Sequence, residues 1–376
     1  MAGGRVVVLG AGRVGRAIAW DLAGDWDVCA VDVDQQSLGW LAERRIATAR
    51  ADVRDSQALA KVVQQAHWVV NAVPGFLGFS VLRTLVELGC SVVDISFMPE
   101  DPRVLHELAR QRGVQVAVDC GVAPGFSHLV LGYWFAQAER LDSFFCYVGG
   151  LPKERLLPWE YKAPFSPVDV LEEYTRPARL RRQGQVITLP ALSEPELRYV
   201  PGVGTLEAFL TDGLRTALHT LPVPTMVEKT LRYPGYRDKI LLLRESGLLR
   251  REPVVVDGVQ VAPLAVTALA LAEAWRLAEG EGDVTVMELE AQGFFDGHLR
   301  TRRLFLYDQW DPTTGLSSMG RTTGFTATAI LRALGKGMVR EVGVLLPEVL
   351  GQNLALTRFV ANYLGQRGIQ LSGDGL

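Results

Sequence analysis

The sequence contains few lysines, few cysteines and no long apolar run. Each of these absences excludes a class of protein. Only six of the 39 basic residues are lysines, and the formal net charge is −3. No excess of positive charge therefore points to nucleic acid or to an anionic membrane as a partner. The four cysteines form no CxxC pair, so we expect reduced packing residues and no metal site.

The most apolar stretch, residues 261–275, contains Glu273 and is too short for a membrane span, which needs about 20 residues. We interpret it as a buried helix. A strand begins at residue 6, so we expect no signal peptide and a cytoplasmic location. The length of 376 residues allows two domains.

The first 120 residues alternate between strand and helix patterns. Apolar runs near residues 5–10, 27–34, 47–50, 67–73, 90–96 and 114–119 are each followed by a helical pattern or a turn. Short continuous apolar runs are typical of strands covered on both faces. Right-handed crossovers would join them into a doubly wound parallel sheet, so we predict an α/β chain with a Rossmann domain.

A G-x-G-x-x-G pattern follows the first strand. Gly10 would make the tight turn, Gly12 would let the backbone approach a pyrophosphate, and Gly15 would let the helix pack closely on the strand. Arg13 and Val14 begin the helix, whose free N–H groups favour phosphate. The next strand ends in Asp32, which can accept both ribose hydroxyls and would repel a 2′-phosphate, so we expect NAD as the cofactor.

Three further strand ends fall at the same edge of the predicted sheet, where ligands of such sheets bind. We expect the adenine near Asp52 and Val53, and the pyrophosphate near the loop after the fourth strand. The nicotinamide is expected near the end of the fifth strand. The loop residues are Asn71, Ala72, Val73 and Pro74, and those after the fifth strand are Asp94 and Ser96.

The sixth strand is followed by Asp119 and, further on, His128. An acid beside the cofactor can hold an ammonium group or act as a base. The alternatives are a capping role for Asp119 and a packed core position for His128.

The character of the sequence changes near residue 140, where alternating segments predict a mixed sheet. Residues 204–221 predict a helix on which Glu207 and Thr211 share a face. Residues 226–234 predict a strand that carries Glu228 and Arg232 on one face and Lys229 and Tyr233 on the other. The guanidinium of Arg232 suits a carboxylate, and the alternative is a structural ion pair with Glu228.

The chain resembles the saccharopine dehydrogenase-like family and, within it, the lysine 6-dehydrogenases. The resemblance rests on the segments "GAGRVGRAIAWDL", "ADVRD", "NAVPG", "VVDIS", "GVAPGFSHL", "GTLEAFLTDGLRT", "EKTLRYPGY" and "TTGFTATAI". It implies that the last helices return to the nucleotide domain, so we predict an NAD-binding domain over 1–125 and 325–376. An inserted α+β substrate-binding and dimerisation domain with a mixed sheet would cover 126–324.

The resemblance implies oxidation of L-lysine at its ε-carbon with NAD, which would release ammonia and give the 6-semialdehyde in lysine catabolism. Asp119, His128 and Lys229 are candidates for the catalytic base, and Arg232, Glu207, Thr211 and Tyr233 for substrate binding. A homodimer or higher homo-oligomer is expected. Saccharopine-forming members carry an acid at the position of Ala123, which disfavours saccharopine as the substrate. The alternatives are a saccharopine or related amine-linked dehydrogenase and a non-catalytic NAD-binding protein.

Overall fold

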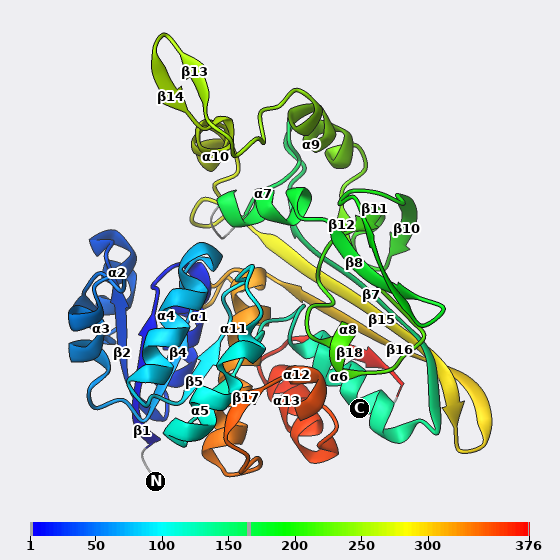
Figure 1. The fold of residues 1–376 in the computed structure, drawn as a ribbon, viewed down its shortest axis with the longest axis horizontal. Coiled ribbons are helices and arrows are strands. Elements are labelled where there is room, and N and C mark those ends of the chain that lie inside the picture. Colours follow the sequence, from blue (N-terminus) through cyan, green and yellow to red (C-terminus); the bar gives the residue numbers. More distant parts are fainter. Residues whose placement is uncertain (1–2, 164–166, 375) are drawn as a thin grey trace. The chain divides into compact units, whose positions relative to one another are not determined.

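The computed structural model describes residues 3–163, 167–374 and 376. It consists of two compact units (Figure 1). The first unit holds residues 1–138 and 320–370 together with residue 376, and the second holds residues 139–319 and 371–375. Each unit is described by itself below.

The first unit is built on a seven-stranded parallel sheet in the order β17-β6-β5-β4-β1-β2-β3. This order confirms the doubly wound α/β prediction. Its strands are β1 (Gly3–Leu9), β2 (Trp26–Asp32), β3 (Ala47–Arg50), β4 (Trp68–Asn71), β5 (Val92–Asp94), β6 (Gln115–Ala117) and β17 (Gly343–Leu345).

Helices flank this sheet. They are α1 (Arg13–Leu22), α2 (Gln35–Ala42), α3 (Ser56–Val63), α4 (Gly75–Glu87), the 3-10 helix η1 (Pro102–Leu105), α5 (His106–Arg112), α6 (Phe126–Gln137), α11 (Ser318–Gly335), α12 (Pro347–Leu350) and α13 (Leu354–Gln366). Apolar side chains of α3, α4 and α5 form one core cluster with the strands. Because continuous apolar strands need cover, this packing explains the uniform burial of β4 and β5.

The unit boundaries lie at 138/139, 319/320 and 370/371, whereas the sequence placed them at 125/126 and 324/325 and assigned all of 325–376 to the nucleotide-binding domain. Helix α6 therefore belongs to the first unit. Gly132 allows α6 to approach α12 closely, since an added Cβ would lie 2.1 Å from the carbonyl oxygen of Glu348.

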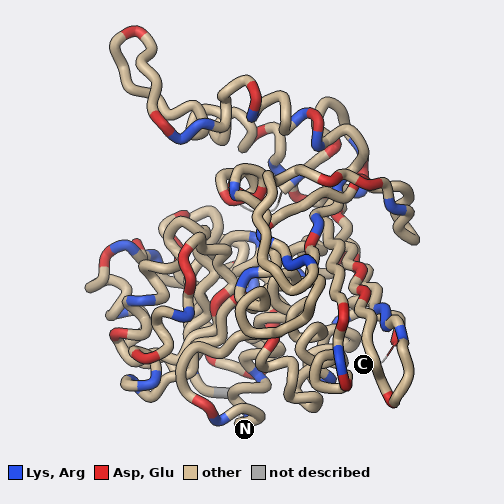
Figure 2. The backbone as a smooth tube through the Cα atoms, turned by 45° about the vertical axis from the view of Figure 1, so that its right-hand side comes forward, with Lys and Arg blue, Asp and Glu red and all other residues tan. Residues whose placement is uncertain are grey.

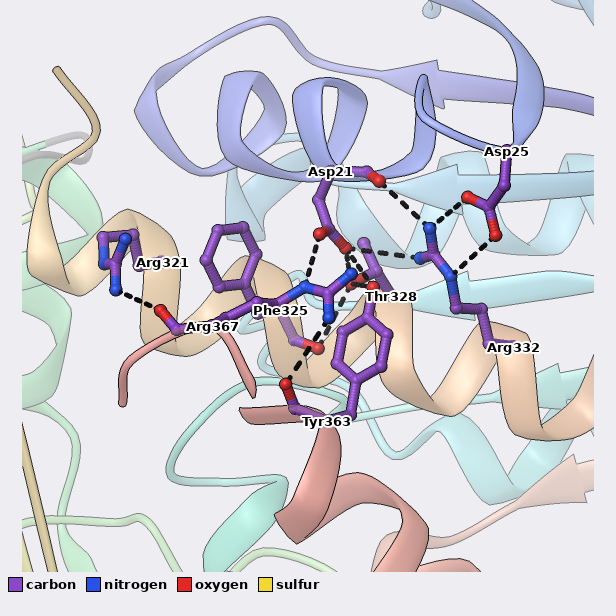
Figure 3. A network of polar contacts seen from close by, with 8 residues as sticks. All are labelled: Asp21, Asp25, Arg321, Phe325, Thr328, Arg332, Tyr363 and Arg367. Atoms are coloured by element: carbon purple, nitrogen blue, oxygen red, sulfur yellow. Dashed lines mark hydrogen bonds and ion pairs between the residues drawn. The ribbon is translucent and has the colours of Figure 1, made fainter. Parts of the chain in front are cut away.

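A buried polar cluster, which we call the Asp21 clasp, joins α1 to the C-terminal helices (Figure 3). The Asp21 carboxylate accepts hydrogen bonds from Thr328, Tyr363 and Arg367 and pairs with Arg332. Arg332 also pairs with Asp25. An acid near a helix C-terminus opposes the helix dipole, and the two arginines offset that cost.

The second unit contains a nine-stranded mixed sheet, which confirms the predicted second sheet. Seven strands follow the order β10-β11-β12-β7-β15-β16-β18, and β8 pairs with both β12 and β9. The strands are β7 (Arg140–Pro152), β8 (Ala178–Arg182), β9 (Gln185–Leu189), β10 (Glu196–Val200), β11 (Gly204–Leu210), β12 (Thr225–Arg232), β15 (Asp283–Phe295), β16 (His298–Gln309) and β18 (Gln370–Gly373). The remaining elements are α7 (Pro167–Thr175), α8 (Ala217–Thr220), α9 (Tyr236–Glu245), α10 (Pro263–Ala274) and the hairpin β13 (Val254–Val256) with β14 (Val259–Val261).

Two predictions for this unit are wrong. The first seven residues of the helix expected over 204–221 form strand β11, which pairs antiparallel with β10 and β12, and only the four residues of α8 are helical. The helix expected to be buried is α10, and it buries only one side, because Leu269 is 77% and Val266 54% exposed.

Charge is distributed evenly through the chain. Figure 2 shows positive and negative residues interspersed along both units. No helix in the described ranges is both long and apolar enough to cross a membrane.

Cys29, Cys120 and Cys146 are buried, and burial raises the pKa of the Cys120 thiol well above its usual range. Residues 3–163, 167–374 and 376 hold no cluster of three or more His, Cys, Asp or Glu side chains suited to a metal.

Candidate nucleotide site and substrate-side cluster

The three glycines of the G-x-G-x-x-G loop have different geometries. Gly10 has a φ of +97°, and an added Cβ would lie 2.4 Å from the carbonyl oxygen of Ala72. A Cβ at Gly15 would lie 1.9 Å from the carbonyl oxygen of Gly10. Gly12 faces open space, with nothing within 4 Å of an added Cβ. The loop therefore has a tight turn, a close helix contact and an open backbone position, which is the arrangement that fits a pyrophosphate.

Helix α1 begins next to this open position. Gly12 is its N-cap and makes no side-chain cap, and the first turn begins with Arg13 and Val14. The positive end of the helix dipole next to an open glycine is suited to phosphate.

The Asp32 carboxylate lies beside the same loop. It accepts hydrogen bonds from the amide of Ala11 at 2.6 Å and from the amide of Asp34 at 2.9 Å. These contacts fix the carboxylate at the end of β2, where a ribose would be bound in such a sheet.

Asp52 and Val53, which follow β3, are both partly buried but have different contacts. Asp52 is bound by Arg54 through both carboxylate oxygens, and this hydrogen bonding lowers the pKa of Asp52 to about 2. Val53 packs partly buried against the sheet core. Contact of either with an adenine stays a prediction.

Asn71, Asp94 and Ser96 form a buried cluster at the ends of β4 and β5. The Asp94 carboxylate accepts from the Ser96 amide at 2.8 Å, from the Ser96 hydroxyl at 2.7 Å and from Asn71 Nδ2 at 2.5 Å. Gly78 makes room for the cluster, since an added Cβ there would lie 2.2 Å from Ser96 Oγ. Burial raises the pKa of Asp94 to about 7 against the lowering effect of these donors.

The side chains predicted to contact the cofactor in this region are mostly buried. Asn71 and Asp94 are fully buried and Val73 is 6% exposed. Ala72 lines the turn through its carbonyl group, and Pro74 is the N-cap of α4. Their assignment to the cofactor stays a prediction.

Asp119 and His128 both lie in the first unit. Asp119 follows β6 with a φ of +52° and is buried. His128 is in the first turn of α6, is also buried, and its Nδ1 lies 3.0 Å from the hydroxyl of Ser127. The buried position of His128 agrees with the packed alternative, and a catalytic role for either residue stays a prediction.

Lys229 and Arg232 lie on opposite faces of β12, as the strand pattern predicts. The Lys229 ammonium donates to the carbonyl of Glu194 and to the carboxylate of Glu196, both at 2.8 Å. These two contacts already engage the Lys229 ammonium within the second unit. A role for Lys229 as the base stays a prediction.

Arg232 lies in a cluster of aromatic side chains that we call the tyrosine cluster. Its Nε donates to the hydroxyl of Tyr174 at 3.1 Å, and its guanidinium stacks 4.8 Å from the ring of Tyr161. The alternative considered for Arg232 was a structural ion pair with Glu228, and the structure instead pairs Arg232 with Glu173 at 3.5 Å. Sequence spacing gave no signal for these partners, since α7 and the segment near residue 161 are far from β12 along the chain.

The tyrosine cluster holds several buried polar atoms. Among the described residues, the indole nitrogen of Trp275 makes no hydrogen bond, and the hydroxyls of Tyr161 and Tyr236 have Arg232 and Tyr174 as their polar neighbours. The rings of Tyr161, Tyr236 and Trp275 lie 4.8–6.2 Å apart. Buried polar groups usually have partners, so this cluster has the capacity to bind a polar group.

The other predicted substrate residues have contacts within the second unit. Glu207 lies opposite Arg232 in the β11–β12 register and accepts from the amide of Gly235 at 3.3 Å. Tyr233 donates to the carbonyl of Pro152 at 3.0 Å. Because residues 204–210 form a strand, the helix face assumed for Glu207 and Thr211 does not exist.

Thr211 instead belongs to a buried acid site. Its hydroxyl donates to Glu228 at 2.7 Å and lies 2.8 Å from the hydroxyl of Thr230. The amide of Gly213 also donates to Glu228. Burial raises the pKa of Glu228 to about 7 despite these donors.

Comparison with known proteins decides the family. Residues 6–117 match the saccharopine dehydrogenase NADP binding domain, and residues 121–369 match the saccharopine dehydrogenase C-terminal domain. The chain belongs to the saccharopine dehydrogenase family. The predicted family is thereby confirmed, and residues 6–117 are a nucleotide-binding domain of the NAD(P) type. The closeness to lysine 6-dehydrogenases stays a prediction.

Individual relatives within the saccharopine dehydrogenase family are distant. The chain is 28% identical over 222 residues to an alpha-aminoadipic semialdehyde synthase of Arabidopsis thaliana, covering 55% of this chain and 21% of that protein. It is 26% identical over 266 residues to the NADP⁺, L-glutamate-forming saccharopine dehydrogenase of Saccharomyces cerevisiae, covering 66% of this chain and 59% of that protein. The chain thus spans less than two thirds of the length of these relatives.

A solved structure confirms the fold. The apo saccharopine dehydrogenase (L-Glu forming) from Saccharomyces cerevisiae aligns with a TM-score of 0.79 and 20% identity, over 99% of this chain and 100% of that one. The similarity extends across both units of the saccharopine dehydrogenase fold.

Proposed function

We propose that this chain is an NAD-dependent dehydrogenase that oxidises a carbon–nitrogen bond of a lysine-derived amine, with L-lysine oxidised at its ε-carbon. The observation that supports it best is the Asp32 carboxylate, fixed beside an open glycine loop in a member of this family. The names of the relatives state NADP, so NAD is our own proposal from Asp32.

The proposed reaction is balanced with the dinucleotide as the hydride acceptor. The ε-carbon of lysine loses a hydride and its amine loses a proton, which gives an imine. Water then adds to the carbon and ammonia leaves, so the product is the 6-semialdehyde, which closes on its own α-amine. Only the neutral amine can lose the hydride, and the chain must therefore supply a group that accepts the ammonium proton.

The tyrosine cluster supports recognition of the amino acid head. Arg232 presents a planar fork that suits a carboxylate, and a buried guanidinium binds an anion more strongly than an exposed one. Tyr161 and Tyr236 add two buried hydroxyls to this cluster. We therefore assign Arg232 to the α-carboxylate, which would leave the ε-carbon at the far end of the substrate.

Asp119 and His128 are our candidates for the proton acceptor. Both belong to the nucleotide-binding unit, and both are buried beside the carboxyl end of β6 or in the helix that follows it. Lys229 is not retained, because Glu196 already holds its ammonium.

A second candidate is the oxidation of saccharopine itself, and the name of the yeast relative favours it. Ala123 disfavours it, since a methyl group there offers no charge to a larger substrate with a second amino acid arm. A third candidate is a protein that binds the dinucleotide without turnover. The predicted homodimer also remains a proposal, which light scattering of the full chain would test.

One experiment separates these candidates. The full chain is mixed with NAD and with lysine, ornithine, saccharopine or glutamate, and the absorbance of the reduced nicotinamide is followed. We expect turnover with lysine and little with ornithine, because a chain one methylene shorter misplaces the reacting carbon. Lysine labelled with heavy nitrogen only at the ε position should release labelled ammonia.

Each other outcome contradicts the proposal in a different way. Label retained in the organic product would show oxidation at the α-carbon. Faster turnover of saccharopine than of lysine would favour the second candidate. Dinucleotide binding without turnover of any of the four compounds would favour the third.

A further inference from the structure

The turn between β2 and α2 carries two carboxylates with different contacts. Asp32 accepts from Ala11 and Asp34, as described above. Asp34 is the N-cap of α2, and its carboxylate accepts from the amides of Gln36 and Ser37, both at 3.1 Å, and from the Ser37 hydroxyl at 2.7 Å. The first turn of α2 therefore already holds an anion that belongs to the chain.

This position is important for the choice of dinucleotide. NAD and NADP differ only in the 2′-phosphate of the adenosine ribose, and the ribose lies at the end of the second strand in sheets of this type. A phosphate at that point needs free N–H groups and positive charge, which the start of the following helix can supply. Here the Asp34 side chain uses those N–H groups.

We propose that Asp34 is a built-in anion that occupies the place of a 2′-phosphate and excludes NADP from the site. This inference rests on the proposed function, because it assumes that the glycine loop binds a dinucleotide. Asp32 would select the ribose hydroxyls, and Asp34 would separately deny the phosphate its N–H donors and repel its charge.

The charge on Asp34 agrees with this role. The hydrogen bonds from Ser37 and Gln36 hold the pKa of the Asp34 carboxyl below its usual range, so the group is ionised at neutral pH. The side chain is exposed, which leaves it open to an approaching ligand.

Two arginines lie near the turn between β2 and α2. Their charge would act on a phosphate there if the charge of Asp34 were removed. Arg50 lies opposite Asp32 in the β2–β3 register, and its Nε donates to the carbonyl of Val33 at 3.1 Å. Arg16 lies over the ring of Trp40 in α2, and its charge contributes to the low pKa of Asp34. Without the Asp34 charge, these arginines would favour a phosphate at the turn.

The test is the substitution Asp34→Asn in the full chain. Asparagine is as good an N-cap as aspartate, so the helix start is kept while the charge is removed. The dissociation constants of NAD and NADP are measured by calorimetry without any amine. We expect NAD to bind within about twofold of the unsubstituted chain and NADP to bind on the order of tenfold more tightly.

The matched control is Asp55→Asn. Asp55 caps α3 in the same way, by accepting from Gln57 and Ala58. The same loss of charge at this helix should leave the ratio of the two dissociation constants unchanged. Raising the salt concentration should weaken NADP discrimination in the unsubstituted chain, since screening reduces charge repulsion between exposed groups.

The outcomes separate this inference from the proposed function. If the unsubstituted chain prefers NAD and Asp34→Asn leaves the ratio unchanged, the role of Asp34 is refuted and the proposed function stands. If the unsubstituted chain binds NADP as tightly as NAD, the inference and the choice of NAD both fail. A chain that binds neither dinucleotide refutes the proposed function together with the inference.

Discussion

Asp94→Asn tests whether burial controls the charge of the cluster at the ends of β4 and β5. Burial raises the pKa of Asp94 to about 7 in the folded chain, whereas an aspartate in an unfolded chain has a pKa of about 3.9. The folded chain therefore binds this proton more tightly than the unfolded chain. The stability that the group contributes is fully present below about pH 4 and is lost as the pH rises to about 7.

The size of the effect follows from the difference between the two pKa values. About three pKa units, at about 1.4 kcal/mol each, give roughly 4 kcal/mol over the whole range. Between pH 5 and pH 8 the expected loss in the free energy of unfolding is about 2.5 kcal/mol. The amide variant cannot ionise, so the stability of the unsubstituted chain relative to the variant should fall by that amount across this interval.

The variant has its own cost, which does not depend on pH. The new amide at position 94 would place an NH₂ group against Asn71 Nδ2, unless the Asn71 amide turns over. Asn71 Oδ1 makes no hydrogen bond within the described part of the chain, so it could accept from the new amide. This rotation of the Asn71 amide would break the 3.3 Å hydrogen bond from Asn71 Nδ2 to the Gly78 carbonyl, which costs about 1 kcal/mol.

Hydrogen exchange of the β4 and β5 amides is the suitable assay, because a chain of two units need not unfold in one step. Comparing the two chains at each pH removes the intrinsic pH dependence of exchange. Asp101→Asn, an exposed N-cap, serves as the control and should show no such trend. A stability difference between the Asp94 variant and the unsubstituted chain that stays constant from pH 5 to pH 8 would refute the reasoning.

Two further variants test the Asp21 clasp and the tyrosine cluster. Asp21→Ala should destabilise the first unit by about 3 kcal/mol, because it leaves Arg367 without its carboxylate. Asp25→Ala should destabilise the unit by less than about 1 kcal/mol, because the Asp25 side chain is half exposed. Equal losses of protection from hydrogen exchange in α11 and α13 for the two variants would contradict this. Arg232→Lys keeps the charge but loses the fork, so it should raise the KM for lysine about tenfold with a smaller change in kcat. Arg303→Ala removes an exposed, paired arginine and is the control; an unchanged KM for Arg232→Lys would remove Arg232 from carboxylate binding.

The sequence predicted the first six strands of the nucleotide-binding sheet because each is a short apolar run followed by a helical pattern. It did not predict β17, which has only three residues and pairs with β6 across more than 200 residues of chain. A local pattern contains no information on such a distant partner. The second sheet was recognised as mixed, but its strands β8, β10 and β18 were missed. Only β18 shares this cause, because it pairs with the distant β16, whereas β8 and β10 pair with their sequence neighbours β9 and β11.

The error at residues 204–221 has a physical cause as well. The segment offers apolar residues that suit either a helix or a strand, and pairing with β10 and β12 decides for the strand. The register of that pairing brings Glu207 opposite Arg232, which a helix could not have indicated. The positions of the substrate-side residues are therefore set by strand pairing, which the local sequence does not reveal. The glycine loop could be predicted because its conformation is set by its own sequence.

The acids at the ends of the parallel strands show why position alone does not predict a role. Asp32, Asp34 and Asp94 all follow apolar strands, and the sequence gave Asp32 and Asp94 the same kind of task. In the structure Asp94 is turned inward by donors from Ser96 and Asn71, and Asp34 is held by the start of α2. Asp32 alone of the three accepts from the glycine loop. The donors that reach each carboxylate are set by the folded backbone, and they determine which acid is left for a ligand.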